Sequence, residues 1–423
     1  MSTQKQDLLR PIKAPTPADG KFHLIKLEYA ANSLLKAFKS RQITKDDKIL
    51  IEKYVAWLTR GDRSIGRLNK ITFHLVGSRR FIGEFRTNTI DDLTVGINRL
   101  KNDEIMTIGS EHKPMHPYKQ NTKRDFVSII KKFYIWLVKN GYSAISKDDV
   151  SELKVPNGDT MTKTAADIFT EEEIHSMISA CDSSMERAMI ITLYEGGLRI
   201  KELGTLTWGL VSFTEQNAII NVNVKTSIPR RIPVYSAKPY LAAWKSDYPY
   251  PIESDSLVFL NELHHPFKHA TITKRIRKIA QRAGITKKIN AHNFRHTRVS
   301  HLKQKGRSEY SIKAITWGNQ NTKMLATYCH LCDADVDKEL SDMYGITDIN
   351  PSKSHVMDPR QCTHCGNVNS PTSNYCMVCG LPLTPEELLT SEQLKVEIEN
   401  TPLYKTIMEE LQKKFSSGVF AKV

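Results

Sequence analysis

The sequence predicts a mainly α-helical chain with one small β-sheet, an α+β fold divided into several modules. Apolar residues recur at helical spacing through most of the chain, whereas the stretch 220–234 alternates apolar and polar residues as a β-hairpin does. Near the C-terminus, two Cys-x-x-Cys-Gly strings predict a small metal-bound module. A chain of 423 residues is too long for one compact core and suits two medium domains with an added module.

The first part of the chain is predicted to be a flexible polar leader, residues 1–22, followed by a small helical domain, residues 23–145. Helical patterns occupy 49–58, 90–100 with Thr89 as the cap, and 126–137 with Gly141 as the stop. Four basic residues surround the last helix: Lys123, Arg124, Lys131 and Lys132. They either contact phosphates or form an ordinary solvated face, and the sequence favours neither interpretation.

A second domain is expected over residues 168–350, after a charged linker, 146–167, that contains Pro156, Asn157 and Gly158. Thr170 and Glu173 form a capping box that opens its first helix, and helical patterns resume at 272 after the hairpin. The cysteine module, 355–383, and a terminal helical segment, 384–423, follow. The segment opens with Thr384, Pro385 and Glu387 as cap, first-turn proline and capping-box acid.

The charge balance favours a polyanionic partner. Lys plus Arg is 61 and Asp plus Glu is 46, a formal net charge of +15, which suits nucleic acid before membrane, although a basic solvated surface is the simpler alternative. No stretch is apolar enough to span a membrane, and the polar N-terminus is unlike a signal peptide. We therefore expect a soluble, intracellular protein, and its odd number of cysteines, 7, suits a reducing compartment.

Two short segments of the second domain place cations where a phosphate could bind. In Gly196-Gly197-Leu198-Arg199-Ile200-Lys201-Glu202-Leu203, two glycines end a helix and Arg199 lies near the start of the next, where backbone donors converge. Taken alone, Arg199 and Glu202 are more often a surface ion pair. Lys225 lies at the turn end of the hairpin and can reach into a groove, but hairpin tips carry lysines simply because they are exposed.

Two further segments add a proton carrier and a candidate nucleophile. In the helix 291–297, His292 and Arg295 share a face and Phe294 points to the core. In 317–330, Asn321 or Thr322 caps a short helix whose Met324 and Leu325 pack inward, and Tyr328 follows one turn later. A single tyrosine is weak evidence, so its weight comes from its order after the other segments.

Together these segments resemble the signature of the tyrosine recombinase (phage integrase) family. The matching strings, in the family's order, are Gly-Leu-Arg-x-x-Glu-Leu at 197–203, the hairpin Lys225, His-x-x-Arg-His-Thr at 292–297 and Tyr-x-His at 328–330. The resemblance covers about 170–346, and the helical domain before it is similar to the core-binding domain with which these enzymes clamp DNA. The string Met343-Tyr344-Gly345-Ile346 and the cysteine module further resemble an archaeal branch of integrases.

The resemblance implies a role for each residue. Arg199 and Arg295 would hold the phosphate, Tyr328 would attack it, Lys225 would be the general acid and His292 an acid/base partner, with Glu202 in support. The 3′-phosphotyrosyl link preserves the bond energy, so the chemistry needs neither metal nor nucleotide. The implied partner is double-stranded DNA with a specific recombination site, on which the chain forms a tetramer, in the cytoplasm at the nucleoid.

One position departs from the family pattern. The His or Trp usually found nine residues before the tyrosine falls on Asn319, with Trp317 two positions away. Asn319 can donate a weaker hydrogen bond, and Trp317 could substitute with its indole N–H. This departure is the one feature that favours an alternative function, a catalytically silent DNA-binding or architectural protein on the same fold.

The cysteine module predicts one structural zinc ion bound by Cys362, Cys365, Cys376 and Cys379. Each glycine after a Cys-x-x-Cys lets backbone amides turn toward the thiolates, and four sulfurs leave no open position for substrate. Two disulfides or free thiols are the alternative. Such a closed site suits docking on DNA or on a neighbouring subunit. A zinc-ribbon factor that binds RNA or protein would explain the module but not the four motifs. Cys329 and Cys332 are interpreted as ordinary thiols.

Overall fold

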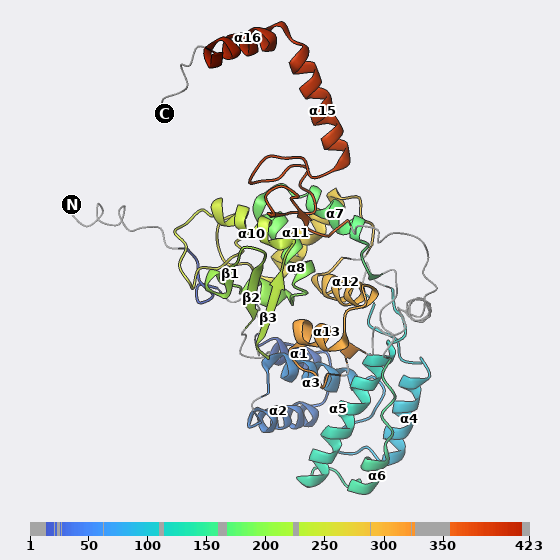
Figure 1. Cartoon of the computed structure of the whole chain (residues 1–423). Helices are drawn as coiled ribbons and strands as arrows, with labels where there is room; N and C mark the ends of the chain where they lie inside the picture. The colour runs from blue at the N-terminus through green and yellow to red at the C-terminus, as the bar shows by residue number, and fades with distance from the viewer. Residues whose placement is uncertain are drawn as a thin grey trace, which may run out of the picture. The chain divides into compact units, whose positions relative to one another are not determined.

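The computed structural model describes residues 14–20, 22, 26, 28–61, 63–109, 114–159, 167–222, 228–287, 289–322, 324–325 and 356–416. The chain forms two compact units (Figure 1). The helical unit is Leu24–Thr162, and the larger unit combines Met1–His23 with Lys163–Val423. None of the helices in the described ranges is long and apolar enough to cross a membrane.

The helices of the helical unit are α1 Glu28–Lys39, α2 Lys45–Thr59, α3 Ile65–Ser78, α4 Ile90–Lys101, α5 Gln120–Lys139 and α6 Lys147–Glu152. The longest helix, α5, packs against three of its neighbours, α3, α4 and α6, while α1 and α2 pack against α3. Phe133, Tyr134 and Leu137 of α5 are fully buried, because apolar residues three and four apart share one face of the helix. The predicted cap and stop are confirmed: Thr89 forms a capping box with Asp92, and Gly141 follows α5 at a φ of 68°.

Two of the four basic residues around α5 have structural partners. Lys123 is buried, donates to the Lys101 carbonyl at 2.9 Å and pairs with Asp103 at 2.6 Å. Lys131 donates to the backbone carbonyls of Ser151 and Leu153. Arg124 and Lys132 are exposed, so only these two fit the phosphate-contact interpretation.

The two segments that flank the helical unit in the sequence differ from the sequence-based prediction. Within the predicted linker 146–167, residues Lys147–Glu152 form α6, because Ser146 caps the helix and Val150 inserts fully into the core beside α5. Within the predicted flexible leader 1–22, Ala14 and Phe22 are buried in the core of the larger unit. The Leu257 amide donates to the Pro15 carbonyl at 2.8 Å, which helps to hold this segment in place. Such long-range packing leaves no periodic signal in a short segment.

The larger unit packs helices beside a small antiparallel sheet of three strands (Figure 1). In chain order its elements are α7 Glu171–Ser179, α8 Ser184–Glu195, α9 Ile200–Gly204, the 3-10 turn η3 Trp208–Leu210, β1 Val211–Phe213, β2 Ala218–Val222, β3 Arg230–Val234, α10 Ala237–Ser246, α11 His269–Arg282, α12 Ala291–Gln304 and α13 Glu309–Trp317. The predicted hairpin is confirmed, with Ile220 opposite Ile232. The capping box of Thr170 and Glu173 opens α7 as predicted. Strand β1 was not predicted, since three residues are too few for a pattern.

The cysteine module lies on the larger unit and contains β4 Arg360–Gln361 and β5 Val368–Asn369. Ser236 donates to the Met357 carbonyl at 3.0 Å, and the hydroxyls of Tyr240 and Thr372 share a hydrogen bond of 2.5 Å. Helices α15 Pro385–Asn400 and α16 Pro402–Ser416 follow, and α15 has no buried residue. Thr384 caps α15 as predicted, but the Glu387 side chain accepts from Asn374 and Tyr375 of the module instead of completing a capping box.

Candidate active site

The carboxylate of Glu202 is the centre of a cluster of three arginines. Its Oε1 accepts from Arg199 Nη1 at 2.7 Å, and its Oε2 accepts from the Arg199 backbone N–H at 2.7 Å. Arg230 Nη2 donates to Oε2 at 2.6 Å, and Arg295 Nη1 lies 3.9 Å from the same oxygen. One buried negative charge thus faces three positive charges, which leaves an excess of positive charge for an anionic ligand.

The turn between α8 and α9 places Arg199. Gly196 ends α8, and Gly197 has a φ of 52°, a left-handed conformation that glycine adopts without steric cost. The sequence-based prediction of two glycines between two helices is therefore confirmed. Because Arg199 stands at the start of α9, Glu202 one turn later reaches back to its amide. The Arg199 side chain is 42% exposed, so this arginine opens toward solvent.

Arg295 joins the cluster from α12. Asn290 caps this helix, Phe294 is fully buried as predicted, and Arg295 is only 2% exposed. The Arg295 guanidinium donates through Nη1 to the Gly197 carbonyl at 2.8 Å and through Nη2 to the Thr316 carbonyl. It therefore links the α8–α9 turn to the end of α13.

Arg230, on β3, is the member of the cluster that the sequence-based reasoning missed. Its side chain is fully buried and donates to Glu202 and, through Nη1, to the Thr316 carbonyl at 2.6 Å. A signal was present in the sequence: Arg230 precedes Ile232 and Val234 on the inward face of an alternating strand. An arginine at an inward position requires a buried acceptor, and Glu202 is that acceptor.

Electrostatics keep this cluster charged. Burial acts to raise the pKa of Glu202, but the Arg230 charge and the hydrogen bonds from Arg199 and Arg230 outweigh it, so the pKa lies below its ordinary value. Burial lowers the pKa of Arg230, opposed by Glu202, but an arginine remains protonated near neutral pH. The cluster is thus an ionised network held together by charge-assisted hydrogen bonds.

His292 is an exposed residue in the first turn of α12, one turn before His296, whose ring centroid is 4.3 Å away. It shares α12 with Arg295, as the spacing predicted.

The two candidates for the donor that the family has nine residues before the tyrosine lie at the end of α13 and just after it. The Trp317 ring centroid lies 5.7 Å from the Arg295 guanidinium carbon, a cation–π contact. Asn319 is exposed, and its Oδ1 accepts from the Asn321 amide at 2.9 Å. Thr322 accepts from the Met324 amide as a cap does.

Of the two residues expected to pack inward after this cap, only one does so. Leu325 is buried, whereas Met324 is 48% exposed, so that half of the prediction was wrong. Lys225, Tyr328, Cys329 and Cys332, together with the string 343–346, lie outside the described residues.

The four predicted zinc ligands come together in the structure. Their sulfur atoms all lie within 4.8 Å of one another, and Cys362 and Cys379, like Cys365 and Cys376, have sulfurs 3.5 Å apart. A disulfide needs about 2.05 Å, so the four thiols are free in this arrangement. Backbone N–H groups, first those of Cys365 and Cys379, lower the pKa values of Cys362 and Cys376. Four converging sulfurs fit a tetrahedral zinc ion.

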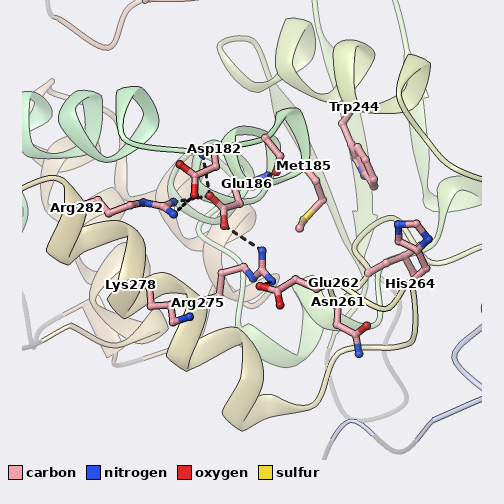
Figure 2. A pocket seen from close by; sticks show the side chains of 12 residues that line it. Asp182, Met185, Glu186, Trp244, Asn261, Glu262, His264, Arg275, Lys278 and Arg282 are labelled. Atoms are coloured by element: carbon pink, nitrogen blue, oxygen red, sulfur yellow. Dashed lines mark hydrogen bonds and ion pairs between the residues drawn. The ribbon is translucent and has the colours of Figure 1, made fainter.

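A cavity of about 470 Å³ lies elsewhere on the larger unit, between α8, α11 and the loop 260–264 (Figure 2). Several of its charged residues pair with one another: Arg275 donates to Glu186 Oε1 at 3.0 Å, and Arg282 donates to Glu186 Oε2 at 2.6 Å. None of the predicted site residues is among those that line it. The ion pairs tie α11 to α8, which is a structural role.

The chain is similar to proteins of known family. Residues 167–334 match the phage integrase family. Over 228 residues the chain is 27% identical to "Tyrosine recombinase XerC" of Xylella fastidiosa, covering 53% of this chain and 74% of that protein. Over 306 residues it is 24% identical to "Transposase A from transposon Tn554" of Staphylococcus aureus, covering 65% of this chain and 79% of that protein.

Two solved structures have a similar fold. XerH site-specific recombinase, bound to palindromic difH substrate in a post-cleavage complex, superposes with a TM-score of 0.51 at 14% identity, covering 79% of this chain and 100% of that one. A lambda integrase dimer bound to a COC′ core site gives 0.50 at 13% identity, covering 65% and 95%. These likenesses agree with the predicted fold class, mainly helical with a small sheet.

Proposed function

We propose, from the match of residues 167–334 to the phage integrase family, that this chain is a tyrosine-type site-specific DNA recombinase. The observation that supports this function most directly is the arginine cluster around Glu202, which opens to solvent at Arg199. Three arginines with one carboxylate suit a phosphodiester group, whose non-bridging oxygens accept bidentate hydrogen bonds.

The proposed reaction exchanges one phosphodiester bond for another. The Tyr328 oxygen attacks the phosphorus and forms a 3′-phosphotyrosyl bond, while the bond from phosphorus to the 5′ oxygen breaks. Lys225 protonates the leaving 5′ oxygen, and His292 accepts the proton of the tyrosine. In the second half of the reaction, a 5′ hydroxyl attacks the phosphotyrosine. This step re-forms a phosphodiester bond and releases the tyrosine hydroxyl. Because the bond energy is preserved, no nucleotide is consumed, and the arginines supply the positive charge that metal ions provide in other phosphoryl-transfer sites.

We assign Arg199 and Arg295 to the phosphate on different grounds, because one is exposed and the other is buried. Arg199 is open and anchored by Glu202, which fixes its position before DNA binds. Arg295 is deeply buried, so its contact with a phosphate requires the strand to enter the cluster beside Trp317. Trp317, stacked near Arg295, is our preferred substitute for the usual His or Trp, and Asn319 is the weaker candidate.

The proposed partner is double-stranded DNA with a specific site. The net charge of +15 favours a polyanion, and the two fold neighbours described above carry DNA in their structures. We further propose that the helical unit is the core-binding domain, that the chain assembles as a tetramer on DNA, and that it acts at the nucleoid in the cytoplasm. The Tn554 relative supports a role in a mobile element.

For the cysteine module we propose a structural zinc ribbon over 355–383. Cys362, Cys365, Cys376 and Cys379 would hold one zinc ion, which supplies a rigid fold and no chemistry. We propose that the module docks on DNA or on a neighbouring subunit. We also propose that the chain belongs to an archaeal branch of integrases, which the string 343–346 and the cysteine module resemble.

The decisive experiment traps the covalent intermediate. A nicked duplex that loses its 5′ fragment after cleavage should accumulate protein joined to DNA, and the Tyr328→Phe variant should bind the duplex yet form no adduct. Chelating magnesium should not reduce cleavage. An adduct that persists in Tyr328→Phe would refute the assignment of the nucleophile. A wild-type chain that binds its site without any adduct would favour the silent DNA-binding protein, the alternative suggested by Asn319.

A further inference from the structure

We infer that Arg230 is a positioning residue of the phosphate clamp, holding Arg199 and Arg295 in place through Glu202 and the end of α13. This inference rests on the proposed function and assigns a supporting role to a residue whose side chain is fully buried. A buried guanidinium persists only where its charge and its N–H groups are matched, so the structure around it must be built for it.

The first anchor is Glu202. Its Oε2 receives the Arg230 Nη2 group at 2.6 Å, and the same carboxylate holds Arg199 through Oε1. Glu202 therefore stands between the buried arginine and the exposed one. Without Arg230, the carboxylate would lose its closest buried cation and would be free to turn toward Arg199 and Arg295 alone.

The second anchor is the carbonyl of Thr316 in the last turn of α13. The final carbonyl groups of a helix lack helical partners and carry the negative end of the helix dipole. Here one such carbonyl accepts from both Arg230 and Arg295. The two buried arginines thus share one acceptor, and each limits where the other can lie.

Backbone packing between the end of α13 and β3 also limits where the Arg230 side chain can lie. Gly318 ends α13 with a φ of 68°, and a Cβ atom at this position would lie 2.9 Å from Arg230 Cγ and 3.2 Å from the Pro229 carbonyl oxygen. The end of α13 therefore lies directly on the first residues of β3. Arg230 Nε has no hydrogen-bond partner within the described ranges, so the two Nη groups provide the anchoring.

The positive charge of Arg230 explains how it supports the other two arginines. Among the described residues, three arginines face Glu202, and these four side chains together carry a formal charge of +2, three positive charges less one negative. Without Arg230, the formal charge falls to +1 and Glu202 neutralises one of the two arginines assigned to the phosphate. Arg230 thus satisfies the carboxylate so that Arg199 and Arg295 retain charge for the substrate.

The test compares Arg230→Met with Arg231→Met, which removes the same charge from the next, exposed residue of the strand. Single-turnover cleavage is measured on a nicked duplex with an ordinary scissile phosphate, and on one in which a methyl group replaces a non-bridging oxygen and removes the negative charge. Relative to wild type, Arg230→Met should cleave the phosphate on the order of 10²-fold more slowly, since it weakens the clamp. Its deficit on the neutral methylphosphonate should be below about tenfold, because less charge needs stabilising there.

Structural damage is distinguished by two further measurements. The urea midpoint of the larger unit shows whether Arg230→Met folds, and Arg230→Lys should recover part of the rate by restoring the charge without the fork. If Arg230 acts through Glu202, the double variant Arg230→Met/Glu202→Gln should be no more than about threefold slower than the worse single variant.

Several outcomes would overturn the inference. Equal deficits on both substrates would indicate a general loss of structure, and independent, multiplying effects in the double variant would show that Arg230 does not act through Glu202. Equal rates for Arg230→Met and Arg231→Met, with an active wild type, would refute the inference while leaving the proposed function intact. A wild-type chain that forms no adduct would refute the proposed function and this role with it.

Discussion

The ring of Phe22 lies against the backbone of Gly204, so closely that a Cβ atom on Gly204 would come within 2.1 Å of Phe22 Cε2. Gly204 ends the short helix α9, which begins next to Arg199 and contains Glu202. An N-terminal residue thus supports the element that carries two members of the arginine cluster. The packing requires glycine at 204, because any side chain there would displace the ring.

Replacing Phe22 by Ala should destabilise the larger unit by about 3 kcal/mol, since a buried ring is lost and a cavity remains next to α9. Gly204→Val should have a similar effect by steric conflict. The urea midpoint of the larger unit measures both. Phe73→Ala is the matched control, because Phe73 is 43% exposed and belongs to the helical unit. Equal midpoints for Phe22→Ala and Phe73→Ala would contradict the role of Phe22.

Purified protein should contain one zinc ion per chain, and Cys362→Ser should lower the zinc content sharply, because a tetrahedral thiolate site loses a ligand. Cys181→Ser is the control: Cys181 is buried outside the module and donates to the Met177 carbonyl, a bond that a serine hydroxyl can replace. Elemental analysis after gel filtration measures the metal. Zinc content that is unaffected by Cys362→Ser would exclude the site.

The donor near the scissile phosphate can be identified with two conservative changes. Trp317→Phe keeps an aromatic ring beside Arg295 and removes the indole N–H, whereas Asn319→Ala removes only the exposed amide. If Trp317 is the donor, Trp317→Phe should slow single-turnover cleavage by about 10²-fold and Asn319→Ala by much less. The reverse order would assign the donor to Asn319. Asn319→His would then be expected to speed cleavage, since imidazole is the donor that the family usually has there.

Lowering the pH should reduce the stability of the larger unit, because His301 is buried as a neutral ring. Burial lowers the pKa of His301 to about 4, and its Nδ1 lies 2.9 Å from the Tyr194 hydroxyl. The unfolded chain takes up a proton near pH 6.5, whereas the folded chain does so only near pH 4. The stability contributed by the neutral ring is therefore complete above the unfolded pKa and is lost as pH falls through this window, by roughly 3 kcal/mol in all.

The variant His301→Gln should flatten this dependence, because an amide can still contact Tyr194 but does not titrate. Urea midpoints between pH 4.5 and 7, the interval suggested by the ordinary and shifted pKa values, provide the measurement. His264→Gln, at an exposed loop position, is the control. A wild-type midpoint that does not change across this interval would rule out a buried neutral His301.

The sequence predicted the elements whose signals are local. The caps at Thr89 and Thr170, the glycines before Arg199 and the shared helix of His292 and Arg295 are each set by residues within one or two turns. What it did not predict depends on distant partners. Arg230 becomes part of the site only because the fold brings β3 to Glu202 and Thr316, and Phe22 becomes core only because Gly204 leaves room for it.

The order of the units along the chain has a practical consequence for dissecting them. The larger unit combines Met1–His23 with Lys163–Val423, so the helical unit is an insertion and two covalent connections join the units. A fragment that simply starts at 163 would lose Ala14 and Phe22 from its core. An internal deletion that splices residue 23 to residue 163 through a short glycine-serine bridge would keep them. We expect that excised form to behave as an autonomous domain, whereas the truncated fragment should precipitate or be degraded by proteases.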